Sequence, residues 1–284
     1  MKVGITGASG LIGSNLKVAL ISSGIEVIGI PRRALYSTDS FKAYVTELDG
    51  IINLAGANIG KRWTSSYMKE IYNSRVETTR NLVNAIREVS KRPKFFISAS
   101  AVGIYAKEGI HDEDSKQFSK GFLGMVCIDW EKALSGLDEL GVRRVVMRQG
   151  VVLARGGGFL SPFNLPLFKL VFPVFGKNAN FPWIHIVDLV EVYKRAIFDD
   201  GMTGVYNLVT PQMITLWELL SKIADKKGAL LKVPVPEWIL RFILRRQAEM
   251  IFDTPKVVPK RLMELGFEFK YPDIDTAIED LIGG

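Results

Sequence analysis

The sequence predicts an α/β fold in which a doubly wound parallel sheet carries helices on both faces and a smaller lobe follows. Three observations lead to this class. Apolar, strand-like runs alternate with helix-like stretches in the first half of the chain, and such alternation is typical of a parallel sheet. A glycine-rich turn joins the first strand to the first helix. The length of 284 residues exceeds the usual size of one domain, about 150 residues.

The elements follow one another in a regular order. Short β-type runs at residues 2–6 and 25–30 flank a helix-like stretch whose apolar residues share one face. The buried strand "GIINLAG" precedes a long helix predicted from "SSYMKEIYNSRVETTRNLVNAIREV". Then come the strand "KFFISAS", the helix "GFLGMVCIDWEKALSGLDELG" and the strand "VRRVVMRQGVVL". This order predicts strands that are joined by crossover helices.

Two stretches depart from regular alternation. Between Arg32 and Ile51 only one helix fits, near "TDSFKAYVTEL", so a third strand is at best the fragment Arg33–Tyr36. After Gly156 the pattern loosens into a Pro- and Phe-rich segment, before "WIHIVDLVEVYKRAIFD" and "GVYNLV" restore one helix and one strand. We therefore predict two domains, residues 1–153 plus about 183–209, and residues 154–182 plus 210–284.

Composition favours an ordinary globular protein. Hydrophobic residues make up 48% of the chain and charged residues 24%, which excludes a disordered class. The formal charge of +7 raises the question of nucleic acid, but the basic residues are scattered and no nucleic-acid motif accompanies them. We therefore expect no nucleic-acid partner, and we expect the basic excess to attract anionic small ligands.

Cysteine usage and hydropathy give further expectations. The single cysteine cannot form an internal disulfide, and "MKVGITG" lacks the regions of a signal peptide, so we expect a cytoplasmic protein. The longest apolar stretch, "FLSPFNLPLFKLVFPVFG", contains three prolines and a lysine and is a poor membrane span. We expect no membrane partner. With two histidines and one cysteine, no transition-metal site is predicted.

The turn "TGASGLIG" at residues 6–13 has the spacing of a dinucleotide-binding loop. Gly7 allows a tight turn after the strand, Gly10 lets the backbone approach a pyrophosphate, and Gly13 allows the helix to pack closely on the sheet. The helix N-terminus adds N–H donors and a partial positive charge. A structural glycine turn is the alternative, but the strand–turn–helix context favours a dinucleotide. The predicted contacts are Gly7, Ser9, Gly10, Leu11, Ile12 and Gly13.

The end of the second strand indicates which dinucleotide is bound. NAD-binding proteins typically carry an acidic residue there, whereas this chain has "IPRR". Arg32, which follows Pro31, suits the 2′-phosphate of NADP because a guanidinium matches phosphate geometry. The alternative is a pair of solvated surface arginines. The sequence thus predicts NADP(H) as the cofactor, with Pro31 and Arg32 among its contacts.

Motifs along nearly the whole chain resemble one family. In order they are "TGASGLIG", "INLAGANI", "RWTSSYMKEIYNSRVETTRNLV", "FFISASAVGIYA", "GFLGMVCIDWE", "RQGVVLARGGG", "PWIHIVDLVE" and "PKRLMELGFEF". The chain resembles an atypical extended short-chain dehydrogenase/reductase, and more narrowly the epimerase family proteins, a nucleoside-diphosphate-sugar epimerase-like branch with its own C-terminal domain. The resemblance implies a Rossmann-like NADP-binding domain with a smaller C-terminal substrate lobe.

The resemblance also implies further cofactor contacts. Small residues of "NLAG" would end a strand against the adenosine side of the cofactor. Two residues of "KEIYNSR" are similar to cofactor contacts in this branch, although without the family they would form a solvated ion-pair face. A valine of "RQGVV" is similar to a backbone contact near the nicotinamide. The residues so implied are Leu54, Ala55, Gly56, Glu70, Arg75 and Val152.

The usual catalytic pair of that family has no counterpart in this chain. Most members carry a tyrosine and a lysine four residues apart, and by the resemblance these positions fall on Leu123 and Cys127. We expect Cys127 to be a small buried hydrophobe. Ser100 matches the family's serine, which would hydrogen-bond a substrate oxygen. Tyr105 is the nearest proton donor, although "VGIY" is also a natural apolar strand end. Ser100 and Tyr105 are therefore the catalytic candidates, and His185 is expected to be structural.

Two functions stay open. The first is an NADP(H)-dependent oxidoreductase or epimerase-like enzyme that lacks the usual Tyr/Lys pair and acts on an unknown small-molecule substrate. The second is a non-catalytic, NADP(H)-binding regulatory protein that acts through a protein partner. For that partner, "EWILRFILRRQAEMIF" offers Trp238, Ile239, Phe242 and Ile243, unless this helix packs on its own core. A homodimer is also left open.

Overall fold

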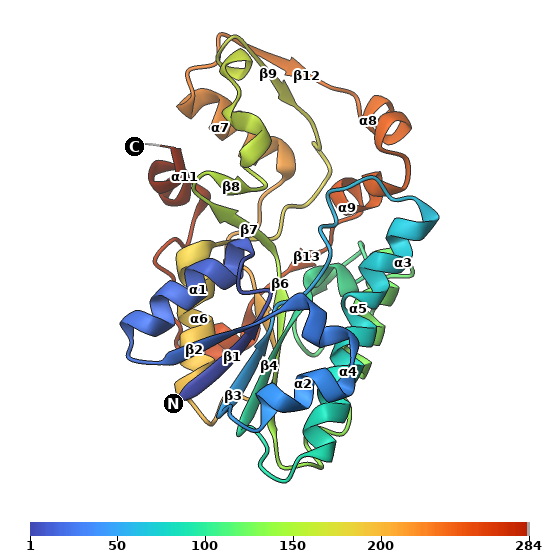
Figure 1. Ribbon diagram of the computed structural model, residues 1–284. Coiled ribbons are helices and arrows are strands. Elements are labelled where there is room, and N and C mark those ends of the chain that lie inside the picture. Colours follow the sequence, from blue (N-terminus) through green and yellow to red (C-terminus); the bar gives the residue numbers. More distant parts are fainter. Residues whose placement is uncertain (283–284) are drawn as a thin grey trace. The chain divides into compact units, whose positions relative to one another are not determined.

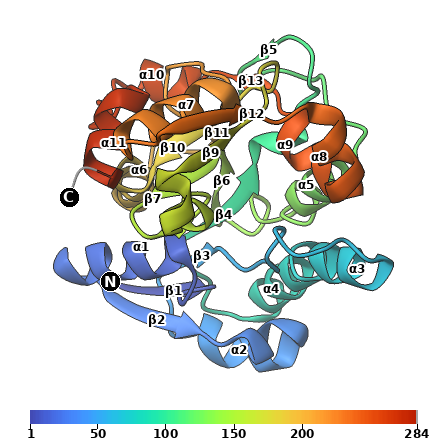
Figure 2. The same cartoon turned by 90° about the horizontal axis from the view of Figure 1, so that it is seen from above.

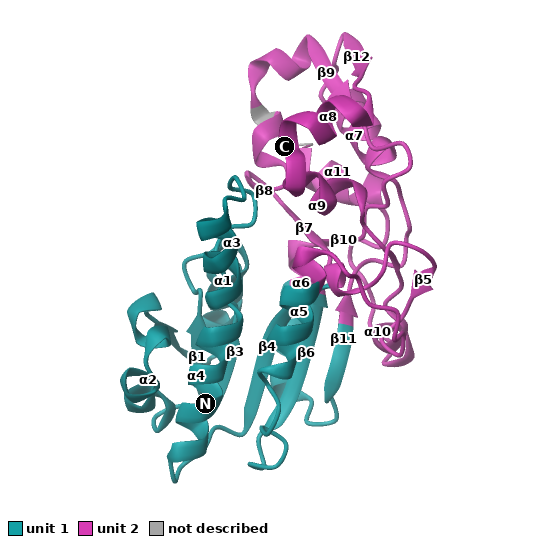
Figure 3. Ribbon diagram, turned by 90° about the vertical axis from the view of Figure 1, so that its right-hand side faces the viewer, with its two compact units in different colours: residues 1–101, 125–148, 190–206 teal, residues 102–124, 149–189, 207–284 magenta. Residues whose placement is uncertain are grey.

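The computed structural model describes residues 1–282 and divides into two compact units (Figure 3). Unit 1 comprises residues 1–101, 125–148 and 190–206, and unit 2 comprises residues 102–124, 149–189 and 207–284. Compared with the predicted domains, unit 2 also takes residues 102–124, 149–153, 183–189 and 207–209. Glu113 ties the first of these segments to unit 2, because its carboxylate accepts hydrogen bonds from the backbone N–H groups of Asn207 and Arg261.

A six-stranded sheet has the order β11-β6-β4-β3-β1-β2 (Figure 1). β1 pairs in parallel with β2 and with β3, and β3 pairs in parallel with β4. The strands are β1 (Lys2–Thr6), β2 (Glu26–Ile30), β3 (Gly50–Asn53), β4 (Phe95–Ala101), β6 (Arg143–Gln149) and β11 (Gly204–Leu208). The predicted α/β class with a Rossmann-like parallel sheet is confirmed.

The predicted strand fragment at Arg33–Tyr36 is wrong. Residues Arg32–Tyr36 form a short 3₁₀ helix, η1, and the sheet ends at β2. Ala34 and Leu35 are both buried, at 3% and 2% exposure. A strand turns successive side chains to opposite faces, so two adjacent side chains that enter one apolar cluster require a helical turn instead.

The long predicted helix is divided in two, α3 (Ser65–Asn73) and α4 (Val76–Glu88). Ser74 lies at the break, where its hydroxyl donates to the carbonyl of Ile71 and accepts the backbone N–H of Ala57. In unit 1, α1 (Leu11–Ser22) and most of α6 (Ile186–Phe198) lie on one side of the sheet, and α4 lies on the other (Figures 1 and 2). The remaining helices of this unit are α2 (Thr38–Val45) and most of α5 (Phe122–Lys132).

Unit 2 is assembled from short pieces around its own core. Three small sheets pair β7 (Val151–Ala154) with β10 (Trp183–His185) and β8 (Gly157–Gly158), β9 (Val171–Val174) with β12 (Leu231–Pro234), and β5 (Ile110–His111) with β13 (Lys256–Val257). Its later helices are α7 (Leu216–Lys226), α8 (Glu237–Leu244), α9 (Glu249–Phe252), α10 (Lys260–Glu264) and α11 (Ile274–Ile282). Trp183, Phe172 and Phe252 lie at the centre of the core, each at most 1% exposed. Within residues 1–282, the helices are all too short or too polar to cross a bilayer.

Candidate functional site

The glycine turn forms a backbone cradle between β1 and α1. Gly7 has φ +68°, and a Cβ there would lie 2.8 Å from the carbonyl oxygen of Leu54. A Cβ on Gly13 would lie 2.3 Å from the carbonyl oxygen of Gly7. Both positions therefore exclude a side chain. Gly10, at the N-terminus of α1, differs, because its Cβ would meet only the Gly7 carbonyl oxygen, at 3.3 Å.

A pocket of about 440 Å³ opens at this cradle, a volume in the usual range for small-ligand sites. Its walls come from the ends of β1, β2 and β3 and from the start of α4. The lining residues are Gly7, Ala8, Ser9, Gly10, Gly29, Ile30, Pro31, Arg32, Leu35, Tyr36, Leu54, Ala55, Gly56, Ala57, Ser74 and Thr78. The structure thus brings together eight of the predicted contacts, Gly7, Ser9, Gly10, Pro31, Arg32, Leu54, Ala55 and Gly56.

Arg32 lies in the pocket wall at the end of β2 and contacts another predicted residue. Its Nη2 donates a hydrogen bond of 2.8 Å to Glu70 Oε1, and its Nε donates one of 2.9 Å to the hydroxyl of Tyr36. The Arg32 and Glu70 side chains are 63% and 45% exposed, so their ion pair contributes little to stability. The contact instead holds the guanidinium at the pocket.

Arg75 lies behind the pocket wall. Its Nη2 and Nη1 donate to the carbonyl oxygens of Ala57 and Ile71 at 3.1 and 3.3 Å, and its guanidinium lies 5.5 Å from the Trp130 ring centroid. Burial lowers the pKa of Arg75, and none of the carboxylates in the described part of the chain forms an ion pair with it. A Cβ on Gly56 would lie 2.8 Å from Arg75 Cζ. A glycine at position 56 therefore leaves the space that the Arg75 guanidinium occupies beside the pocket. A positive group held there fits an anionic ligand.

A second polar cluster lies at the end of β4. Ser100 Oγ donates a 2.7 Å hydrogen bond to Glu131 Oε1, while Arg148 donates to both oxygens of that carboxylate, at 2.8 and 2.7 Å. Ser100 and Arg148 are buried, at 3% and 5% exposure. Since the Ser100 proton is committed to Glu131, its hydroxyl oxygen is left as an acceptor of hydrogen bonds.

Sequence reasoning did not find Glu131 and Arg148 as partners of Ser100. They lie on α5 and β6, and the bonds join residues 31 and 17 positions apart in the chain. No local spacing could have revealed them, because the fold alone brings these elements together. In the parallel register Asn53 pairs with Ser98, so Ser100 reaches the same edge of the sheet as Leu54 and Ala55.

Leu123 and Cys127, where the resemblance would place the usual catalytic pair, lie on α5. Cys127 is 5% exposed, and burial raises the pKa of its thiol to about 12. The thiol is therefore protonated at neutral pH and is a weak nucleophile. Leu123 is partly buried on the same helix. Neither residue offers an acid or a base.

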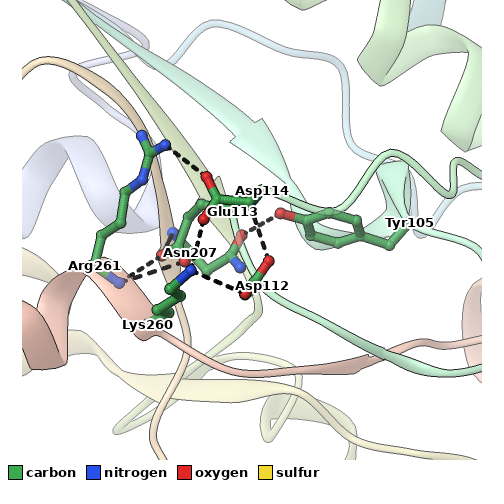
Figure 4. A network of polar contacts seen from close by, with 7 residues as sticks. All are labelled: Tyr105, Asp112, Glu113, Asp114, Asn207, Lys260 and Arg261. Carbon is green, nitrogen blue, oxygen red and sulfur yellow. Dashed lines mark hydrogen bonds and ion pairs between the residues drawn. The ribbon is translucent and has the colours of Figure 1, made fainter.

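Tyr105 lies in the interior of unit 2, in a polar network shown in Figure 4. The side chain is 1% exposed, its hydroxyl donates a 2.8 Å hydrogen bond to Asn207 Oδ1, and its ring stacks on His111 with 5.1 Å between centroids. Glu113 accepts the backbone N–H of Asn207, and burial raises the pKa of this carboxyl group. Val152, another candidate, is a half-buried residue of β7 in the same unit.

The predicted residues thus fall into separate groups. Leu11, Ile12 and Gly13 belong to the first turns of α1 rather than to the pocket lining. Ser100 lies in unit 1, whereas Tyr105 and Val152 lie in unit 2. The structure therefore gathers one pocket and one buried polar cluster in unit 1.

Comparisons with known proteins agree with this architecture. Residues 3–120 match the NAD dependent epimerase/dehydratase family, and residues 235–281 match a Domain of unknown function (DUF1731). An epimerase family protein of Staphylococcus saprophyticus is 32% identical, with 98% of each chain covered.

Solved structures give the same result. The crystal structure of a human epimerase family protein with NADPH has a TM-score of 0.89 at 30% identity, with 100% of both chains covered. A UDP-glucose 4-epimerase of Thermus thermophilus in complex with NAD has a TM-score of 0.77 at 19% identity, covering 99% of this chain and 97% of the other. That second likeness concerns the fold alone. The chain belongs to the epimerase family and carries that family's C-terminal domain of unknown function.

Proposed function

We propose that this protein binds NADP(H) in the pocket of unit 1 and acts as an oxidoreductase or epimerase-like enzyme on a small molecule. The observation that carries the proposal is the position of Arg32 in the pocket wall, at the end of β2 and close to the glycine cradle. When bound, the nicotinamide would supply the hydride chemistry. The human relative was crystallised with NADPH, which supports the same cofactor class here.

The residues present fit such a dinucleotide. Gly10 keeps the cradle open where a pyrophosphate would lie, and the N–H groups that begin α1 point donors toward that anion. Arg32, oriented by Glu70, would pair with the 2′-phosphate. Leu54 and Ala55 form an apolar wall suited to adenosine, and the charge of Arg75 lies behind it.

On the substrate side, we propose Ser100 as the group that holds an oxygen of the reacting molecule. Glu131 accepts the Ser100 proton and Arg148 fixes Glu131 from two nitrogen atoms. The hydroxyl is therefore oriented by a rigid, buried ion pair. This arrangement is suited to positioning, because Arg148 occupies both oxygens of the carboxylate that holds the Ser100 proton.

The cofactor proposal is tested by calorimetric titration of NADPH and NADH into wild type, Arg32→Ala and Arg33→Ala. Loss of a charge-assisted contact of about 1.5–3 kcal/mol weakens binding roughly ten- to hundredfold. We expect that loss for NADPH with Arg32→Ala, while NADH is little affected. Arg33 is exposed and is not part of the pocket lining, so its variant is the matched control. Equal NADPH and NADH affinities in the wild type would contradict the proposal.

A second candidate function is a non-catalytic, NADP(H)-binding regulator. The observation in its favour is the exposure of Trp238 and Phe242, at 71% and 82%, together with the absence of the Tyr/Lys pair at Leu123 and Cys127. The two functions are separated by following NADPH oxidation with a panel of aldehydes, ketones and quinones. The enzyme function is supported if wild type turns over at least one compound of the panel and Ser100→Ala turns it over more slowly. Tight NADPH binding without turnover across the panel favours the regulator.

A further inference from the structure

An acidic side chain lies beside the end of β2, although "IPRR" at that end contains none. Glu70 belongs to α3, 38 residues after Arg32 in the chain, and its Oε1 lies 2.8 Å from Arg32 Nη2. Arg32 itself is part of the pocket lining. NAD-binding proteins typically use an acid at this end of β2 to bind the ribose 2′-hydroxyl. The fold thus returns a carboxylate to a place where the local sequence lacks one.

The position of Arg32 does not depend on Glu70 alone. Its Nε donates a 2.9 Å hydrogen bond to the hydroxyl of Tyr36, which also lines the pocket. The bonds to Tyr36 and Glu70 use two of the five guanidinium N–H groups. The other three are left for a ligand, so Arg32 can bind a 2′-phosphate while Glu70 stays in contact with it.

The charge of Glu70 acts differently on the two cofactors. A phosphate bound to the same guanidinium would lie close to the Glu70 carboxylate, and two negative groups repel one another. A ribose hydroxyl would instead donate a hydrogen bond to this carboxylate, because a carboxylate accepts several such bonds. Glu70 therefore opposes the 2′-phosphate of NADP(H) and favours the free 2′-hydroxyl of NAD(H).

We propose that Glu70 limits the preference of the pocket for NADP(H) over NAD(H). Arg32 attracts the 2′-phosphate, and Glu70 reduces that attraction while it supplies an acceptor for the 2′-hydroxyl. The preference is then the balance between one cation and one anion that share a hydrogen bond. This inference rests on the proposed function and deepens it, because it assigns cofactor choice to a pair of residues from β2 and α3 rather than to Arg32 alone.

The test is calorimetric titration of NADPH and NADH into wild type, Glu70→Gln and Glu77→Gln. Glutamine keeps an oxygen that accepts the Arg32 hydrogen bond but removes the charge. We expect Glu70→Gln to bind NADPH roughly three- to fivefold more tightly, the scale of an exposed charge pair. It should bind NADH roughly tenfold more weakly, because a charge-assisted hydrogen bond is lost. Glu77 is the matched control, since it forms a 2.6 Å ion pair with Arg80 at 48% exposure and lies outside the pocket lining.

A double variant shows whether Glu70 opposes the phosphate or only orients Arg32. Arg32→Ala leaves no guanidinium to orient, so a purely orienting Glu70 would have no further effect in that background. If Glu70 opposes the phosphate, Arg32→Ala/Glu70→Gln binds NADPH roughly threefold or more tightly than Arg32→Ala. The inference fails if Glu70→Gln weakens NADPH binding, leaves both affinities unchanged, or changes them no differently from Glu77→Gln. A wild type that binds neither cofactor would contradict the proposed function itself, and this inference with it.

Discussion

The ends of β1 and β4 lie at the same edge of one sheet, yet the site at one end is formed by backbone and the site at the other by side chains. The cradle after β1 is made of backbone, and its critical positions, Gly7, Gly10 and Gly13, lie close together in the sequence, from the turn into the start of α1. The cluster at the end of β4 is made of side chains that come from three elements, namely Ser100, Glu131 and Arg148. A backbone site depends on a few glycines, whereas a side-chain site depends on every element that supplies it.

A site built from backbone makes few demands on the surrounding side chains. The cradle works for any sequence that leaves the glycine positions free of side chains. Leu123 and Cys127 of α5 are partly buried and buried, as expected of apolar residues that pack. A family likeness therefore supports cofactor binding more strongly than it supports a reaction.

The largest expected effect separates two glycines of the cradle. Gly10→Val should weaken NADPH binding roughly a thousandfold or more, because the side chain would occupy the space that a pyrophosphate needs. The variant should still fold, because a Cβ at this position meets only one atom, at 3.3 Å. Gly13→Val should instead unfold the protein, because its Cβ would lie 2.3 Å from a backbone oxygen. Fluorescence of bound NADPH and circular dichroism measure the two outcomes. Retained binding in folded Gly10→Val would mean that the dinucleotide binds elsewhere.

The next largest effect is expected when Glu131 is removed from the side-chain cluster at the end of β4. Glu131→Ala leaves the buried guanidinium of Arg148 without its partner, and loss of one member of a buried ion pair typically costs about 3 kcal/mol or more. Because the side chains of Arg148 and Glu131 are only 7% and 15% exposed, little solvent screening reduces this value. Urea unfolding of wild type, Glu131→Ala and the double variant Glu131→Ala/Arg148→Met measures it. The double variant should recover part of the loss, and a single variant as stable as the wild type would show that the pair is not buried in solution.

The same contrast decides what the sequence could predict. The alternation of strands and helices in the first half of the chain follows from local patterns, and so do five of the eight pocket residues, through the glycine spacing and "IPRR". The other three, Leu54, Ala55 and Gly56, were expected from the family resemblance. The break at Ser74 was missed, because it depends on a hydrogen bond to Ala57 in a distant loop. Likewise, η1 replaced a strand since Ala34 and Leu35 both enter the core. Long-range contacts decide such features, and a local pattern does not contain them.

A third prediction concerns a titrating group in unit 2. Burial lowers the pKa of His185 to about 4, below its usual value near 6.5. In the unfolded chain this histidine binds a proton as the pH falls below 6.5, whereas in the folded chain it stays neutral down to about pH 4. Stability is therefore complete above pH 6.5 and falls, by up to about 3 kcal/mol, toward pH 4.

His185→Gln removes that titration and provides the control. Its Gln side chain does not bind a proton, so the difference in unfolding free energy between variant and wild type should change between pH 7 and pH 4. The measurement is urea unfolding at several pH values. A constant difference across this range would show that His185 titrates equally in both states.

The smallest expected effect is at Cys127. A buried thiol of pKa about 12 is present almost wholly as the protonated form at pH 7, so iodoacetamide should react with it only when the chain unfolds. Cys127→Ala should cost about 1 kcal/mol of stability for the small void. NADPH affinity should stay within twofold of wild type, because Cys127 is not part of the pocket lining.

A functional thiolate would behave in the opposite way, and the difference is measurable. It would react with iodoacetamide in the folded protein, faster as the pH rises through 7 to 9, and bound NADPH would block the reaction. The alanine variant would then lose turnover by about a hundredfold, the scale on which a positioned acid or base acts. Ser100→Ala is the matched comparison, because its hydroxyl lies in the buried cluster with Glu131. A loss of turnover in Ser100→Ala but not in Cys127→Ala would assign substrate positioning to the cluster at the end of β4 and simple packing to α5.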